Sequence, residues 1–239
     1  MLAIYKRELK SYFQSMIGYV FIAFLALFVG IYFLAYNLNG GNPYFAYALY
    51  SVLFIFIVAV PILTMKCFAE ERKSKTDQLL LTSPVSLTGI VVGKYLAMVT
   101  VFLIPILLFC FYPLVIKLNG TAYLKVDYAA LFVFFLLGCV YISVGMFISS
   151  LTESQIISAI GTFAVLVIMY MWGSFLTLLP SNTVGSFLSE WLGKLDLTGI
   201  LADVLASSIL NVNGIILYLS FIFVFVFLTI QSIQKRRWS

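Results

Sequence analysis

The residues that could do chemistry in this chain are few. The sequence has no histidine, and its three cysteines, Cys67, Cys110 and Cys139, stand singly in apolar or nearly apolar segments. Zinc sites, histidine-based triads and disulfide frameworks need pairs or clusters of such residues. The sequence therefore predicts a protein that is not an enzyme and that holds no metal or other cofactor.

One stretch superficially resembles a phosphate-binding loop, namely Gly89-Ile-Val-Val-Gly93-Lys94. That motif needs four residues between its glycines, a serine or threonine after the lysine and a preceding strand, and all three are missing. We therefore predict that the chain binds no ATP by itself. For Lys94 we expect a position at the inner membrane interface, with its aliphatic stem reaching toward lipid phosphates.

The charged residues concentrate in residues 66–94. Glu70, Glu71, Arg72 and Lys73 are expected to continue an apolar helix beyond the membrane, with Glu71 and Lys75 as an i,i+4 pair. A run of three leucines follows. It is closed by a proline, and helices usually end before a proline. A short exposed helix with leucines favours docking on a partner protein; the alternative is a solvated connector whose leucines dip into the interface. The leucine run and the three residues that close it are Leu79, Leu80, Leu81, Thr82, Ser83 and Pro84.

The first sixteen residues form a second pattern, typical of an amphipathic helix. We expect this helix to lie flat on the inner leaflet and to turn at Gly18 into the first span, either as a working part or as a generic surface anchor. The apolar face comprises Leu2, Tyr5, Leu9, Tyr12, Phe13 and Met16, and the opposite face Lys6, Arg7, Lys10 and Gln14.

The elements that must position these segments are membrane spans. The chain has 239 residues, of which 63% are apolar and 10% charged, and its mean hydropathy is +1.11. Water-soluble chains are nearer 45–50% apolar, and one span needs about 20 apolar residues. We predict an all-α integral membrane protein, one transmembrane domain over residues 1–239. Its six spans are 17–36, 44–65, 95–116, 128–149, 156–179 and 212–234.

The basic residues give the orientation. Eleven of the 14 lie at the two ends of the chain or in residues 66–94, whereas Lys117, Lys125 and Lys194 lie in the alternate loops. The positive-inside rule then predicts an inner (cytoplasmic) membrane protein with both termini in the cytoplasm. Loops that face anionic lipid account for the net charge of +5, so no nucleic-acid partner is expected.

The six predicted spans contain no Asp, Glu, Lys or Arg. Ion-coupled transporters usually carry such groups in their pathway, and intramembrane hydrolases need paired carboxylates or a Ser/His pair. If the protein moves a cargo, we therefore expect the energy to come from another chain. Uncharged spans suit amphipathic or hydrophobic cargo, such as peptides, antimicrobials or lipid-like molecules.

Residues 180–211 form the longest outer segment. Its apolar residues alternate with charged ones at helical spacing, and it is too broken to span a membrane. An external interfacial helix is one interpretation. In another, Glu190, Asp196 and Asp203 meet a cationic cargo.

The charged loop and its neighbours resemble the permease subunit of ABC-type exporters with the type V exporter fold, and among these the gliding-motility-associated type. Three positions depart from the usual pattern: Lys75, where glycine is common, Gln78, where glutamate is common, and Met16, where proline is common. The matching stretches are Glu8 with Tyr12-Phe13 and Ser15…Gly18-Tyr19-Val20; Pro61…Thr64-Met65…Phe68-Ala69-Glu70-Glu71-Arg72; Leu79 to Val85 with Gly93-Lys94; and Phe227-Leu228-Thr229…Arg236-Arg237-Trp238.

This resemblance implies a pathway formed by two permease copies, which we expect to be a homodimer, above two copies of an ATPase subunit that binds ATP and magnesium. It also implies short re-entrant helices in residues 180–211. A channel or structural membrane protein that acts without an ATPase is the alternative. The implied coupling-helix residues are Glu70, Glu71, Arg72, Thr76, Leu79, Leu80, Leu81, Thr82, Ser83 and Pro84, and those of the connecting helix are Lys6, Arg7, Glu8, Lys10, Tyr12 and Phe13.

Overall fold

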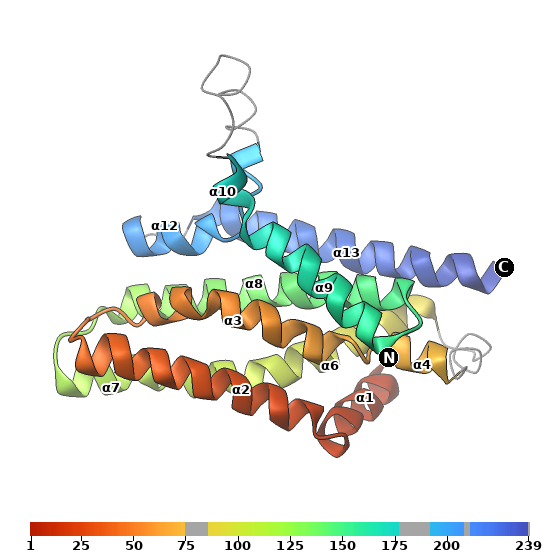
Figure 1. The fold of residues 1–239 in the computed structure, drawn as a ribbon, viewed down its shortest axis with the longest axis horizontal. Coiled ribbons are helices and arrows are strands. Elements are labelled where there is room, and N and C mark those ends of the chain that lie inside the picture. The colour runs from red at the N-terminus through yellow and green to blue at the C-terminus, as the bar shows by residue number, and fades with distance from the viewer. Residues whose placement is uncertain (75–85, 177–191, 208–210, 239) are drawn as a thin grey trace, which may run out of the picture.

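The computed structural model describes residues 1–74, 86–176, 192–207 and 211–238, which form helices and no strand. The predicted all-α class is therefore confirmed (Figure 1). The helices are α1 (Leu2–Gln14), α2 (Ile17–Tyr32), η1 (Phe33–Asn39, a π-helix that continues α2), α3 (Ala46–Thr64), α4 (Ala69–Lys73), α6 (Leu87–Phe109), α7 (Tyr112–Asn119), α8 (Leu124–Leu151), α9 (Gln155–Tyr170), α10 (Trp172–Leu176), α12 (Gly199–Ser207) and α13 (Val212–Trp238).

Within the described residues, five helical stretches are long and apolar enough to cross a membrane: Ile17–Asn39, Ala46–Lys73, Leu87–Asn119, Leu124–Leu151 and Val212–Lys235. The fifth predicted span corresponds to α9, which has only 16 residues. After a break at Met171 the chain continues as α10, and residues 177–191 lie outside the described part. A multi-pass membrane protein is thus confirmed, and a sixth span stays a prediction.

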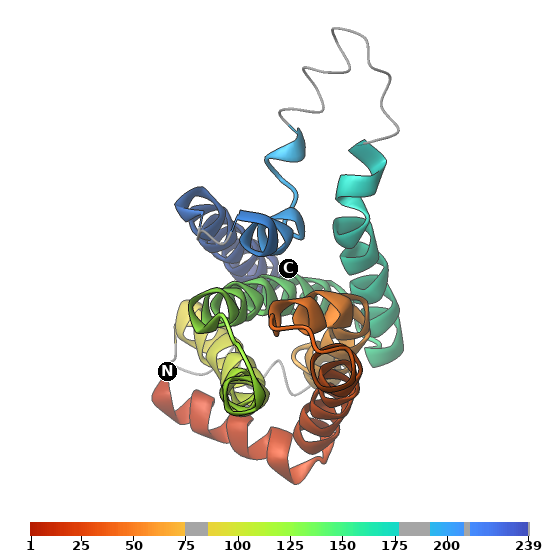
Figure 2. The same cartoon turned by 90° about the vertical axis from the view of Figure 1, so that its left-hand side faces the viewer.

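Helix α8 forms the centre of the bundle. It packs against α3, α6, α9, α12 and α13, and Figure 2, which looks along the spanning helices, shows it between α13 on one side and α3 and α6 on the other. Two glycines permit this close packing, because a Cβ atom at Gly138 would overlap the ring of Phe102 and one at Gly145 would overlap Thr64.

Two helices begin earlier than the apolar runs predicted. The third spanning helix begins at Leu87 because Ser86 caps it, its Oγ accepting a hydrogen bond from the Gly89 amide at 3.3 Å. The fourth begins at Leu124. Both now include a buried ionisable residue, Lys94 and Asp127 respectively. The prediction of spans free of ionisable residues therefore holds only for the shorter predicted ranges.

Helix α1 lies across the spanning helices rather than along them (Figure 2). Its apolar side packs against α6 and α2. The turn into α2 falls at Met16, which has a φ of 58°, and not at Gly18 as predicted. Gly18 instead lets the chain pass close to α1, since a Cβ there would lie 3.1 Å from the Tyr12 carbonyl oxygen.

Candidate functional site

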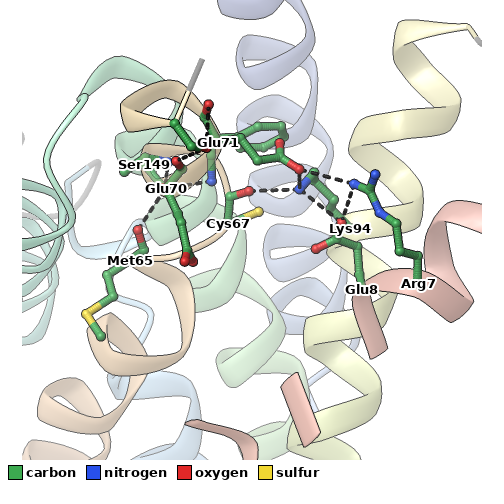
Figure 3. A network of polar contacts seen from close by, with 11 residues as sticks. Arg7, Glu8, Met65, Cys67, Glu70, Glu71, Lys94 and Ser149 are labelled. Atoms are coloured by element: carbon green, nitrogen blue, oxygen red, sulfur yellow. Dashed lines mark hydrogen bonds and ion pairs between the residues drawn. The ribbon is translucent and has the colours of Figure 1, made fainter. Parts of the chain in front are cut away.

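Four charged side chains meet at the end of the bundle where α1, α4 and α6 come together (Figure 3). The Lys94 Nζ atom lies 2.9 Å from Glu71 Oε1 and 3.3 Å from Glu8 Oε1. The Arg7 Nη2 atom contacts the same two oxygens, at 3.1 Å and 2.8 Å respectively. Two cations and two carboxylates therefore alternate around a closed ring, which we call the charge ring.

The ring is most buried at its lysine. The side chain of Lys94 is 2% exposed, Glu8 13%, Glu71 17% and Arg7 56%. Lys94 also donates a hydrogen bond to the Cys67 carbonyl at 2.9 Å. A buried ammonium group is strongly disfavoured unless it is paired and hydrogen-bonded, and here both conditions are met.

Helical spacing explains why Glu8 faces inward. The inward side of α1 contains Tyr5, Glu8, Leu9 and Tyr12, which are the i, i+3, i+4 and i+7 positions of one helix face. A hydrogen bond to Glu8 raises the pKa of Arg7 above its usual value, since the carboxylate favours the charged guanidinium. Burial raises the pKa of Tyr12 well above its usual value, so this residue packs as a neutral side chain.

Close approach of α1 to α6 brings the ring together. A Cβ atom at Gly93 would lie 3.3 Å from the Met1 carbonyl oxygen and 3.4 Å from the Ile4 side chain. The Tyr5 hydroxyl and the Thr100 hydroxyl are hydrogen-bonded at 3.1 Å. The glycine before Lys94 therefore allows Glu8 to reach the ammonium group.

Three further contacts hold α4. The Ser149 Oγ atom on α8 accepts hydrogen bonds from the Phe68 and Ala69 amides at 3.1 and 3.2 Å, which caps the start of α4. In addition, the Arg72 Nη2 atom on α4 forms an ion pair with Glu153 Oε1 at 2.8 Å. Together with the ring, these contacts connect a five-residue helix to α1, α6, α8 and the loop before α9.

The structure brings some of the predicted site residues together and separates others. Arg7, Glu8 and Glu71 meet in the ring, whereas Glu70 pairs with Lys66 at 3.4 Å and not with α1. Lys6 and Lys10 are exposed and have no ion pair within the described part. Tyr12 is buried and Phe13 partly buried against the core. The remaining predicted coupling residues lie outside the described residues: Thr76, Leu79, Leu80, Leu81, Thr82, Ser83 and Pro84.

The prediction for Lys94 was wrong. Its ammonium group does not reach toward lipid phosphates but is enclosed by Glu8, Glu71 and the Cys67 carbonyl. Sequence reasoning also missed Ser149 and Glu153 as contacts of α4. A lysine in the apolar stretch Val91 to Tyr95 is a signal of a buried partner, but the carboxylates that supply it are 23 and 86 residues away, at Glu71 and Glu8.

In the outer segment the structure describes residues 192–207. The Asp196 Oδ1 atom accepts hydrogen bonds from the Thr198 amide and hydroxyl and from the Gly199 amide, at 3.0, 2.8 and 3.1 Å. This oxygen therefore caps α12. Glu190, another acidic residue of this segment, lies outside the described residues, as do residues 180–191 and 208–210 of the predicted re-entrant region.

Among the described residues, no group of three or more His, Cys, Asp or Glu side chains could hold a metal ion. The fold and the charge ring together define a multi-pass helical membrane protein with a buried ionic junction at one end of its bundle. The model of a family described as ABC-2 family transporter protein matches residues 35–230, and the chain belongs to this family of ABC transporter permeases. No curated protein sequence matches the chain.

Proposed function

We propose that the chain is the permease subunit of an ATP-driven exporter of the type V fold, similar to the gliding-motility-associated permeases. Two copies form the pathway in the inner membrane, with both termini in the cytoplasm, and a separate ATPase chain binds beneath each. The segment after α4 contains the coupling helix that enters the ATPase, and α1 is the connecting helix.

The way α4 is held is the observation that supports this proposal most directly. Helix α4 ends at Lys73, six positions before the first of the three leucines, Leu79 to Leu81. The charge ring, the Ser149 cap and the Arg72–Glu153 pair connect it to three other helices. A displacement of the leucine segment by an ATPase would therefore be passed through α4 to α1, α6 and α8.

Membership of a transporter family favours this proposal over a channel or a structural protein that acts alone. Permeases of this family normally work with an ATPase. The match begins at residue 35, so α1 and its two ring members lie outside the matched region.

The proposed cargo is amphipathic or hydrophobic: a peptide, an antimicrobial or a lipid-like molecule. Within the described spanning helices, Lys94 is enclosed by the charge ring, and one carboxylate oxygen of Asp127 accepts a hydrogen bond from the Ala46 amide at 3.3 Å. Neither Lys94 nor Asp127 therefore places a charged group in the middle of a spanning helix, where a cargo would pass. Stimulation of ATP hydrolysis by the reconstituted complex, across a panel of such molecules, tests the cargo class.

Co-purification with an ABC ATPase subunit tests the partner and the stoichiometry. We expect two copies of each chain by native mass measurement. Replacing Leu79, Leu80 and Leu81 by serine should weaken the complex, because each fully buried leucine contributes about 1.5–3 kcal/mol. A permease that purifies and functions without an ATPase would overturn the proposal.

Matched substitutions of the adjacent residues Glu71 and Glu70 test whether the charge ring couples the ATPase to the permease. Glu71→Gln opens the charge ring between α1, α4 and α6, so transport should fall while the complex still forms and hydrolyses ATP. Glu70→Gln breaks only an exposed pair within one segment, which contributes about 0–1 kcal/mol, and transport should remain near normal. Equal transport by both variants would contradict coupling through the ring.

A further inference from the structure

The outward face of α1 is basic. Lys6, Arg7 and Lys10 are all exposed, whereas the only acidic residue of the helix, Glu8, is turned into the charge ring. Lys6 and Lys10 are one helical turn apart, and so are Arg7 and Lys10. Like charges at this spacing destabilise a helix, so an anionic partner would stabilise α1.

The position of α1 indicates what kind of partner this is. The helix crosses the ends of α6 and α2, as Figure 2 shows, and therefore runs in the plane of the membrane surface when those helices span the membrane. Exposed apolar side chains lie at both ends of the basic face: Leu2 is 69% exposed and Met16 73%. The first turn of α2 adds exposed Tyr19 and Val20.

Cationic side chains flanked by exposed apolar side chains are complementary to a phospholipid, because the phosphate can pair with the cations while the acyl chains contact the apolar residues. We propose that the basic face of α1, formed by Lys6, Arg7 and Lys10, binds the phosphate of an anionic phospholipid headgroup. Leu2 and Met16 contact the adjoining acyl chains.

Arg7 connects this face with the charge ring. Both of its ion pairs run through Nη2, and its side chain is 56% exposed, so Arg7 remains accessible from outside the ring. A headgroup at Lys6 and Lys10 is thus next to the residue that closes the ring. This inference does not depend on the ATPase or on the cargo.

Lipid binding to the full-length chain tests the proposal. Purified protein is titrated with phosphatidylglycerol and, separately, with phosphatidylcholine, and bound lipid is counted by native mass spectrometry. We expect tighter binding of phosphatidylglycerol. Lys6→Gln/Lys10→Gln should weaken that binding by about fivefold for each charge removed, or about 25-fold for the pair.

Two variants serve as controls. Lys117→Gln/Lys125→Gln removes two exposed lysines at the opposite end of the bundle, close to α7 and the start of α8, and should leave binding unchanged. Lys6→Arg/Lys10→Arg keeps the charges and should retain binding.

Three outcomes overturn the proposal. The first is equal affinity of the wild-type protein for the two lipids. The second is an equal loss in the Lys117/Lys125 variant, which would mean that only net charge matters. The third is competition by inorganic phosphate as strong as that by the lipid, which would make the ligand a free anion.

Discussion

At the scale of single residues, Lys94 determines the character of the charge ring. Its ammonium group is almost completely buried, and two carboxylates and a backbone carbonyl surround it. Removing one partner of a buried pair leaves an uncompensated charge, whereas removing both can be nearly neutral. The ring therefore stabilises the junction of α1, α4 and α6 only while it is complete.

Lys94→Met should destabilise the protein by about 2–3 kcal/mol, because Glu8 and Glu71 then face each other with Arg7 as the only cation. We expect the melting temperature in detergent to fall by about 5–10 °C. Lys94→Met/Glu71→Gln leaves the neutral Arg7–Glu8 pair and should recover much of the loss. Lys125→Met, at an exposed position, is the control. Simple addition of the two single effects would contradict the ring.

At the scale of elements, α4 is too short to be stable alone. It has five residues, and its first two amides depend on a serine from α8. Isolated helices shorter than about 12 residues are marginal in water. Tertiary contacts therefore decide whether this helix exists.

Ser149→Ala should free the start of α4, because the Phe68 and Ala69 amides lose their acceptor, at a cost of about 1–2 kcal/mol. Hydrogen–deuterium exchange in residues 68–73 should accelerate about 5- to 30-fold. In Ser143→Ala, where the hydroxyl bonds the Val140 carbonyl of its own helix, exchange in α4 should not change. Unchanged exchange in Ser149→Ala would show that α4 is held by other contacts.

The turn between α1 and α2 gives a second prediction at this scale. Met16 has a φ of 58°, a left-handed conformation that is unfavourable by about 1–2 kcal/mol for residues other than glycine. Met16→Gly should stabilise the junction by about 1 kcal/mol. Met16→Pro should disrupt it, since proline holds φ near −65°. Thermal unfolding and proteolysis between residues 14 and 18 would measure both effects; a stable proline variant would refute the left-handed turn.

At the scale of the whole molecule, the bundle has one basic and ionic end. Helices α1 and α4 and the C-terminus lie together there, with α7 at the other end (Figure 1). If that end faces the cytoplasm, a cysteine at position 238 should react with a membrane-impermeant reagent only after permeabilisation. A cysteine in place of the exposed Asn39 should react in intact cells. Access to position 238 from outside would invalidate the proposed orientation.

The sequence by itself determined the class of the protein and most of its spans. Apolar runs of about 20 residues are a local property, so α2, α3, α8 and α13 were predictable to within a few residues. The resemblance to exporter permeases also placed Glu71 in the predicted coupling segment and Arg7 and Glu8 in the predicted connecting helix, although it did not pair them.

Only the tertiary structure decided how these residues pair. Lys94 and Asp127 border apolar runs, and hydropathy alone leaves both outside the spans. In the structure α6 begins at its Ser86 cap and α8 begins at Leu124, so that both residues lie within helices. Glu70 and Glu71 are adjacent in sequence, yet one pairs locally and the other enters the ring. The physical reason is that an ion pair depends on which helix faces approach one another, and the glycine contact between α1 and α6 sets that approach.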